Sequence, residues 1–134
     1  MSGVRTILPS ELPAYLAADG RLTRVLLDPA TGHPGLELYD VELPPGGASE
    51  LHTRPHPEVL VVLEAAVGVE TRGSVHEATA GSILYIPAGV EHRHVNVGKV
   101  SARFLGIFAP PTGHADEVRK RPTVGSSLPR TGSV

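Results

Sequence analysis

Glycine and proline interrupt this chain so often that long helices cannot be its main element. Its 134 residues include 15 glycines and 13 prolines, the two residues that most often end regular secondary structure. The segments between them are short, rich in Val, Ile, Leu and Thr, and several alternate apolar with polar residues. This pattern predicts many short β-strands joined by turns.

Eight or nine segments have this character. They cover residues 21–28, 36–43, 49–53, 58–65, 67–73, 74–79, 82–87, 92–97 and 101–109. Strands of this number and length predict an all-β sandwich or an antiparallel β-barrel. A barrel of about eight strands leaves an interior just wide enough for one small ligand or metal site.

The two ends of the chain are expected to lie outside this barrel. Residues 1–20 form an N-terminal segment with a possible short helix over 10–20, begun by Ser10 and ended by Gly20. Residues 21–110 form the barrel domain. Residues 111–134 contain few apolar residues in any regular period, so we expect an extended arm and a disordered tail.

Charge and cysteine content restrict the partners and the compartment. The net charge is −2 and there is no long basic cluster, so nothing attracts nucleic acid or an anionic membrane. No cysteine is present, which excludes a disulfide framework. No stretch reaches the roughly 18 apolar residues of a membrane helix, and the first residues lack the pattern of a secretion signal. We therefore expect a soluble, cytoplasmic protein.

Two segments carry side chains suited to a metal site. In the first, residues 51–68, His52, Arg54, His56 and Glu58 occupy alternate positions, so a regular strand would direct all four to one face. Histidine and glutamate offer lone pairs to a divalent cation, whereas arginine offers none and carries a fixed positive charge. A proline on each side of His56 interrupts the strand, so this parity is not expected to persist to Glu58.

The second segment, residues 81–97, has a tight bend followed by alternating polar side chains. His92, His94 and Asn96 alternate along a predicted strand, so they could share a face. With these two segments the chain resembles the cupin superfamily, small β-barrels of the jelly-roll type. The second cupin motif is matched in full, by Gly81, Pro87, Gly89, His92 and Asn96.

The first cupin motif is matched only in part. Gly46, His52 and Glu58 agree with it, but Arg54 stands in place of its second histidine. Its final glycine is also displaced: the expected position holds Ala65, and the nearest glycine is Gly68.

The resemblance implies a metal site and a mode of assembly. By position, His52, Glu58 and His92 would hold a divalent ion (Fe, Mn, Ni or Zn), and His56 could replace the missing fourth ligand. Two histidines and one carboxylate suit non-haem iron with open coordination positions. Small cupins commonly pair through edge strands, so the resemblance also implies a homodimer.

Arg54 has two possible placements. If it points inward, its guanidinium would repel a cation and form a bidentate ion pair with Glu58. If it turns outward at the bend, His56 could swing in as a ligand.

Three functions remain open from the sequence. The first is a metal-dependent enzyme acting on a small molecule as a dioxygenase, isomerase or cyclase. The second is a metal-free binding or sensor module in which Arg54, joined by Arg103 if that side chain faces inward, binds an anionic ligand. The third is a metal-free cyclase or isomerase whose catalytic acid–base pair is Glu58 with His92, the pKa of Glu58 being raised by an apolar interior.

The other polar residues receive simpler interpretations. His94 is expected to support the ligands at most, and Asn96 to hold a turn through side-chain to backbone hydrogen bonds. His33, His76 and His114 lie in turn-rich or edge regions and are expected to be solvated.

Overall fold

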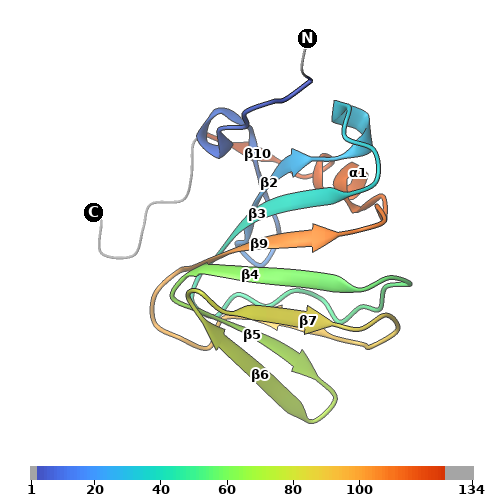
Figure 1. Ribbon diagram of the computed structural model, residues 1–134. Helices are drawn as coiled ribbons and strands as arrows, with labels where there is room; N and C mark the ends of the chain where they lie inside the picture. The colour runs from blue at the N-terminus through green and yellow to red at the C-terminus, as the bar shows by residue number, and fades with distance from the viewer. Residues whose placement is uncertain (1–2, 126–134) are drawn as a thin grey trace.

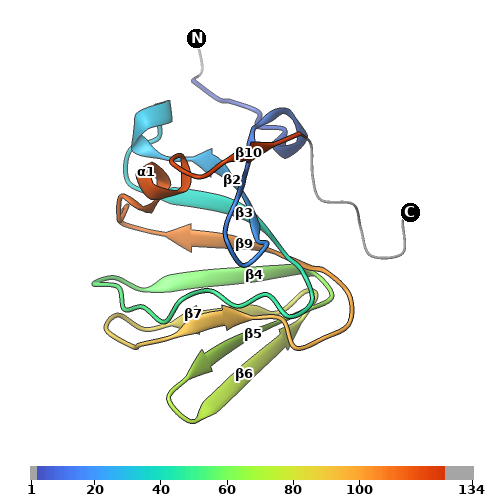
Figure 2. The same ribbon diagram turned by 180° about the vertical axis from the view of Figure 1, so that it is seen from behind.

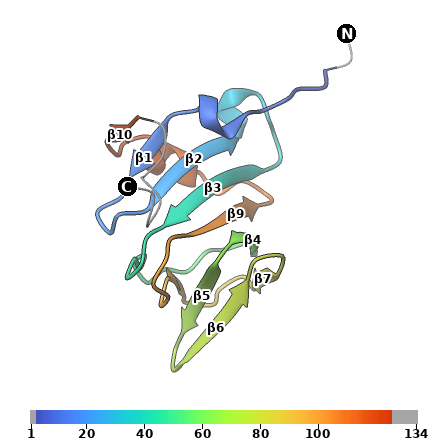
Figure 3. The same cartoon turned by 90° about the vertical axis from the view of Figure 1, so that its left-hand side faces the viewer.

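The computed structural model describes residues 3–125, and its strands form two antiparallel sheets (Figures 1 and 2). The larger sheet has seven strands, in the order β10 (Thr123–Val124), β1 (Ala14–Leu16), β2 (Leu22–Leu27), β3 (Glu37–Leu43), β9 (Ala102–Phe108), β4 (Glu58–Glu64) and β7 (Ile83–Ile86). The smaller sheet has the order β6 (Ser74–Thr79), β5 (Ala66–Thr71) and β8 (Arg93–Val95). Figure 3 shows the β5–β6 hairpin at the opposite end of the molecule from β1 and β10. The predicted all-β fold of jelly-roll type is confirmed.

The alternation of side chains along β9 and β4 directs the core residues, and also Glu58, to the interior. Along β9, Ala102, Phe104, Gly106 and Phe108 are buried, and the residues that alternate with them are half-buried. On the neighbouring strand β4, Leu60 has the same inward parity as Glu58, and both are buried. The two-residue repeat that builds the hydrophobic face therefore also directs a carboxylate into the interior, where it needs partners to remain charged.

The predicted helix over residues 10–20 is wrong. The chain instead makes a short 3₁₀ turn (η1, Pro9–Glu11) and then strand β1, which pairs with β2 on one side and β10 on the other. Ala14, at the start of β1, is fully buried. Helix propensity in so short a segment is weak, and sheet pairing on both sides outweighs it.

The expected extended arm after residue 110 is in part a folded element. Helix α1 (His114–Val118) buries Ala115 and Val118, and β10 then joins the larger sheet. Two apolar residues in one helical turn are too few to produce a recognisable period in the sequence. The region 126–134, where we predicted a disordered tail, lies outside the described residues. Among residues 3–125 no helix has the length and apolar character required to cross a bilayer.

The turn between β4 and β5 explains the displaced glycine. Ala65 has φ of 60°, and no other non-glycine residue in the described part of the chain has a positive φ. The left-handed conformation that favours glycine thus occurs where the first cupin motif has its final glycine. Gly68 lies instead within β5, where an added Cβ would be 2.9 Å from Cγ2 of Val95.

Candidate metal centre

The backbone brings the two motif segments together side by side. The predicted strand over 49–53 is absent as a continuous element, but His52 forms an isolated antiparallel bridge with His92. The two residues exchange backbone hydrogen bonds of 3.0 and 2.9 Å. Further along, the backbone N–H of Gly89, in the bend of the second motif, donates to the carbonyl of Arg54 at 2.9 Å. The geometry of one segment therefore fixes that of the other.

Backbone carbonyls set the tautomer of both histidines. Nδ1 of His52 lies 2.8 Å from the carbonyl of Glu50, and Nδ1 of His92 lies 2.8 Å from the carbonyl of Val90. A carbonyl oxygen can only accept, so each Nδ1 carries a proton, and Nε2 is the atom left to face the interior. An imidazole held this way by an outer hydrogen bond is the usual arrangement of a metal-ligating histidine.

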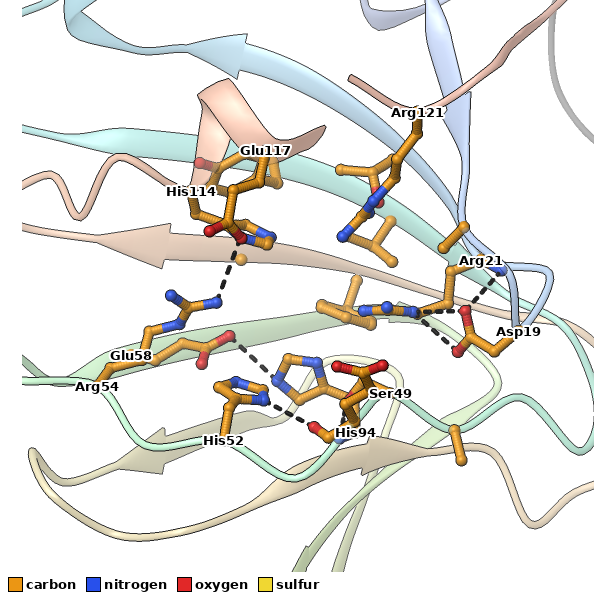
Figure 4. Close-up of a pocket in the computed structure, with 18 of the residues that line it drawn as sticks. Asp19, Arg21, Ser49, His52, Arg54, Glu58, His94, His114, Glu117 and Arg121 are labelled. Carbon is orange, nitrogen blue, oxygen red and sulfur yellow. Dashed lines mark hydrogen bonds and ion pairs between the residues drawn. The ribbon is translucent and has the colours of Figure 1, made fainter. Parts of the chain in front are cut away.

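Glu58 lies between two of the histidines. Its Oε1 is 3.1 Å from Nε2 of His92, and its Oε2 is 3.1 Å from Nε2 of His94. Ligand atoms of His52, Glu58 and His92 all lie within 4.8 Å of one another, close enough to hold a metal ion. Two imidazoles and a carboxylate suit first-row divalent ions such as iron, manganese, nickel and zinc. Figure 4 shows His52, Glu58 and His94 converging at one side of a cavity.

The charge state of this cluster contradicts one of the sequence hypotheses. Burial acts to raise the pKa of Glu58, but the neighbouring His94 and His92 outweigh it and hold the pKa well below its usual range. Burial likewise acts to lower the pKa of His92, and its hydrogen bond to Glu58 outweighs this and raises it. The contact therefore favours a protonated His92 beside an ionised Glu58. The hypothesis that an apolar interior raises the pKa of Glu58 and keeps it neutral is therefore wrong.

The pKa of His52 is shifted in the opposite direction from that of His92. Burial lowers its pKa to about 4, with further lowering by the charges of His92 and Arg54. The side chain is therefore neutral near pH 7, and its Nε2 carries a lone pair. This Nε2 is buried and has no hydrogen-bond partner among the described residues.

Arg54 takes the inward one of the two placements considered from the sequence, but its contacts are not with Glu58. It lines the cavity, but its Nη2 lies 3.3 Å from Nδ1 of His114, and its Cζ is 4.9 Å from the centre of the Phe108 ring. A guanidinium over an aromatic face is a favourable cation–π contact. His56, considered as a fourth ligand, belongs neither to the group formed by His52, Glu58 and His92 nor to the cavity lining. Besides His92, the histidine that adjoins Glu58 is His94.

The cavity beside this cluster has a volume of about 630 Å³. Its apolar walls include Tyr39, Val41, Phe104 and Phe108, and its charged side chains include Arg21, Arg54 and Arg121 (Figure 4). A space of this size and mixed lining is typical of a site for a small molecule.

The cavity residues that sequence reasoning missed include His114 and Arg121, which come from the segment expected to be a loose arm. His114 was expected to be solvated, but burial lowers its pKa to about 3, with contributions from the charges of Arg54 and Arg121. The segment is held by Glu37, a fully buried carboxylate on β3. A glutamate at an inward position of a predicted strand is the one signal that could have indicated this attachment.

Glu37 fixes the start of α1 through several hydrogen bonds. It accepts from the backbone N–H groups of Thr112, Gly113 and Ala115 and from the hydroxyl of Tyr39. These bonds hold the pKa of Glu37 below its ordinary value although burial acts to raise it. The carboxylate therefore sets where α1 begins, and with it the position of His114.

The structure also tests the roles expected for Asn96 and Arg103. Asn96 was expected to hold a turn, and its Nδ2 donates to the carbonyls of Leu43 and Val100, both at 2.9 Å, which confirms the prediction. Arg103 pairs with Asp40 through contacts of 2.9 and 2.6 Å and does not line the cavity. It therefore does not serve the anion-binding role considered for it.

Comparison with known families agrees with this geometry. The family model for the cupin domain matches residues 39–108, a range that contains His52, Glu58 and His92 and most of the barrel. The chain belongs to the cupin family. Among curated relatives, this cupin is 32% identical over 114 residues to germin-like protein subfamily T member 3 of Arabidopsis thaliana, covering 81% of this chain and 49% of that protein. It thus spans about half the length of that relative.

Solved structures share the fold at lower identity. The polyketide cyclase RemF from Streptomyces resistomycificus superposes with a TM-score of 0.70 at 23% identity, covering 81% of this cupin and 82% of that chain. A sugar phosphate isomerase of the cupin superfamily from Silicibacter pomeroyi has a TM-score of 0.69 at 23% identity, covering 81% and 76%.

Proposed function

We propose that this cupin binds one divalent metal ion through His52, Glu58 and His92 and is an enzyme that acts on a small molecule. The observation that carries the proposal is Nε2 of His52. It is buried, neutral, without a partner among the described residues, and aimed at Glu58 and His92. A buried nitrogen without a hydrogen bond is unfavourable, and a bound cation would satisfy it. The metal is one of iron, manganese, nickel and zinc.

The surroundings suit chemistry on a carbonyl or enol compound. When bound, such an ion supplies Lewis acidity toward a substrate oxygen. The rings of Phe104 and Phe108 form a dry wall that packs against the substrate body. Nε2 of His94 contacts Oε2 of Glu58 and fixes the orientation of that carboxylate. The fold neighbours include a cyclase and an isomerase, which supports cyclisation or isomerisation as reaction types beside dioxygenation, although a shared fold does not select among them.

The first test is metal analysis of untagged protein after dialysis against a weak chelator. We expect close to one ion per chain in the wild type. The His52→Ala variant should bind the same ion more than about tenfold less tightly, because losing even an outer partner of a ligand costs 10–100-fold. His76→Ala is the matched control, since His76 is an exposed histidine on β6. Equal metal content in wild type and His52→Ala would contradict the proposed ligand set.

A metal-free binding module is the second candidate function. It is favoured by Arg54, whose positive charge lines the same cavity, and by Glu58, which already has His92 and His94 as partners. If no ion is taken up when iron, manganese, nickel and zinc are each added in excess, this second function replaces the first.

A further inference from the structure

The cavity contains buried N–H groups that no described residue accepts. Nε of Arg54 and Nη1 of Arg121 are both buried and both lack a hydrogen-bond partner among residues 3–125. Both side chains line the same cavity. A buried charged donor without an acceptor is among the most unfavourable arrangements in a protein interior. A ligand that supplies acceptor oxygens at these two points would remove that cost.

The two arginines reach the cavity from opposite sides. In Figure 4, Arg121 extends from the segment after α1, whereas Arg54 extends from the other side toward His114. Both charges act on the His114 side chain between them. Arg21 adds a third positive charge near Arg121, and burial followed by the charge of Arg21 lowers the pKa of Arg121. The guanidinium groups of Arg21 and Arg121 therefore stand close enough to repel one another, and the charges of Asp19, Glu117 and Glu50 offset this only in part, since the pKa of Arg121 stays lowered.

The acidic side chains of the cavity do not take this role. Asp19 is already bound to Nε of Arg21, at 3.0 and 2.9 Å from its two oxygens. Glu50 and Glu117 are exposed, the side chain of Glu117 by 74%, so water solvates their charges. Glu58, the buried carboxylate of the cavity, is engaged by His92 and His94. Since Nε of Arg54 and Nη1 of Arg121 have no acceptor among the described residues, the missing acceptor is expected to arrive with a ligand.

We propose that the substrate is a small organic acid whose carboxylate oxygens are bound by Nη1 of Arg121 and Nε of Arg54, with its carbon skeleton over the histidine cluster. The proposal deepens the proposed function, since it names the substrate class of that site. Binding of the acid by the two arginines does not itself require the metal, so the two proposals can fail separately.

The lining favours a carboxylate over a phosphate. Each arginine offers one buried nitrogen without a partner among the described residues, which suits a planar group with two oxygens better than a phosphate with three or four oxygens to satisfy. Phe104, Phe108 and Val41 form an apolar wall beside these donors, and this wall fits the hydrocarbon part of an organic acid. An inorganic oxyanion would leave the wall without a partner.

Calorimetric titration at constant ionic strength tests the proposal with defined probes. Succinate, malate and gluconate represent the organic acids, succinamide and glycerol are the uncharged counterparts, and inorganic phosphate is the competing oxyanion. Each probe is titrated into protein dialysed against chelator and into protein loaded with zinc. We expect at least one organic acid to bind both forms, and the uncharged compounds not to bind.

The variants identify the donors. Arg121→Gln and Arg54→Gln should each weaken binding of the acid by about tenfold or more, as expected for a charge-assisted hydrogen bond. Arg72→Gln is the matched control, because Arg72 is exposed in the β5–β6 turn, and it should change the affinity less than twofold. Circular dichroism verifies folding, and Arg54→Lys, which keeps the charge but lacks Nε–H, replaces Arg54→Gln if that variant unfolds.

The outcomes distinguish the proposal of organic-acid binding from the proposal of metal binding. Loss of acid binding in the arginine variants with intact metal uptake supports the inference. Metal uptake without binding of any organic acid, binding of phosphate alone, or affinities unchanged in Arg121→Gln and Arg54→Gln would overturn it while leaving the proposed metal site intact. Acid binding that depends on both arginines in a protein that takes up no metal would uphold the inference and overturn the metal-dependent function.

Discussion

His114 is a half-buried histidine held neutral between two arginines. Its Nδ1 accepts a hydrogen bond from Arg54, so protonation at that atom would break the contact. Burial and the charges of Arg54 and Arg121 lower its pKa to about 3, and the opposing charges of Glu37 and Glu58 do not reverse the effect. Folding therefore depends on this ring remaining unprotonated.

The stability of the fold should consequently fall in mild acid. An unfolded chain protonates His114 near pH 6.5, whereas the folded protein does so only near pH 3. The contribution of this residue is therefore fully present above about pH 6.5 and is lost as pH falls toward 3. Between pH 7 and pH 5 it amounts to about 2 kcal/mol. Urea unfolding at a series of pH values measures it.

His114→Asn separates this residue from the other titrating groups. The asparagine Oδ1 can still accept the hydrogen bond from Arg54, but the side chain does not titrate. The variant should show a pH dependence between 7 and 5 that is flatter by about 2 kcal/mol. Parallel curves for the variant and the wild type would show that His114 titrates alike in the folded and unfolded protein, which would contradict the lowered pKa.

At the scale of the element, the turn between β4 and β5 carries a measurable strain. Ala65 adopts φ of 60°, which costs a non-glycine residue roughly 1–2 kcal/mol. Ala65→Gly removes this cost and adds about 0.5–1 kcal/mol of backbone entropy in the unfolded state. We expect a net stabilisation of about 0.5–1 kcal/mol in chemical denaturation. Ala66→Gly, one position later in β5, should destabilise instead, and a loss of stability in both variants would contradict the assigned strain.

Some secondary-structure elements and site residues could be predicted from the sequence, and others could not. Strands β2 to β9 were predictable because alternation and turn residues are local signals, and His52, Glu58 and His92 were predictable because their spacing follows a motif. Strand β1 and helix α1 were missed, since each is stabilised by a distant partner: β1 by β10, and α1 by Glu37. Arg121 belongs to no motif, and only the folded chain brings it to the cavity.

At the scale of the whole molecule, the outer face of the larger sheet is apolar at its edge. Strand β7 ends that sheet, and Ile83 and Tyr85 point outward from it with 66% and 63% of their surface exposed. They lie opposite Val61 and Val59 of β4, which extend the apolar surface inward. Edge strands and exposed apolar patches both favour association.

We expect a second copy of the chain to cover this face, giving a homodimer. Light scattering after size exclusion should then report twice the chain mass of 14.0 kDa. Ile83→Asp should shift the protein toward the monomer, because a buried charge without a partner opposes association. Val97→Asp is the control, since Val97 is 65% exposed but lies in the loop after β8. A monomeric wild type, or a dimer unaffected by Ile83→Asp, would contradict this mode of pairing.

The pairing of β1 with β10 also has a consequence for the order in which the molecule is completed during synthesis. Tyr15 pairs with Thr123, which the ribosome adds 108 residues later, or roughly 5–20 s later at ordinary rates of elongation. Throughout that interval one edge of β1 has no strand to pair with. The histidines and Glu58 have by then been made, whereas Arg121 has not. The nascent protein therefore contains the proposed metal ligands before it contains Arg121, the proposed donor to a substrate carboxylate.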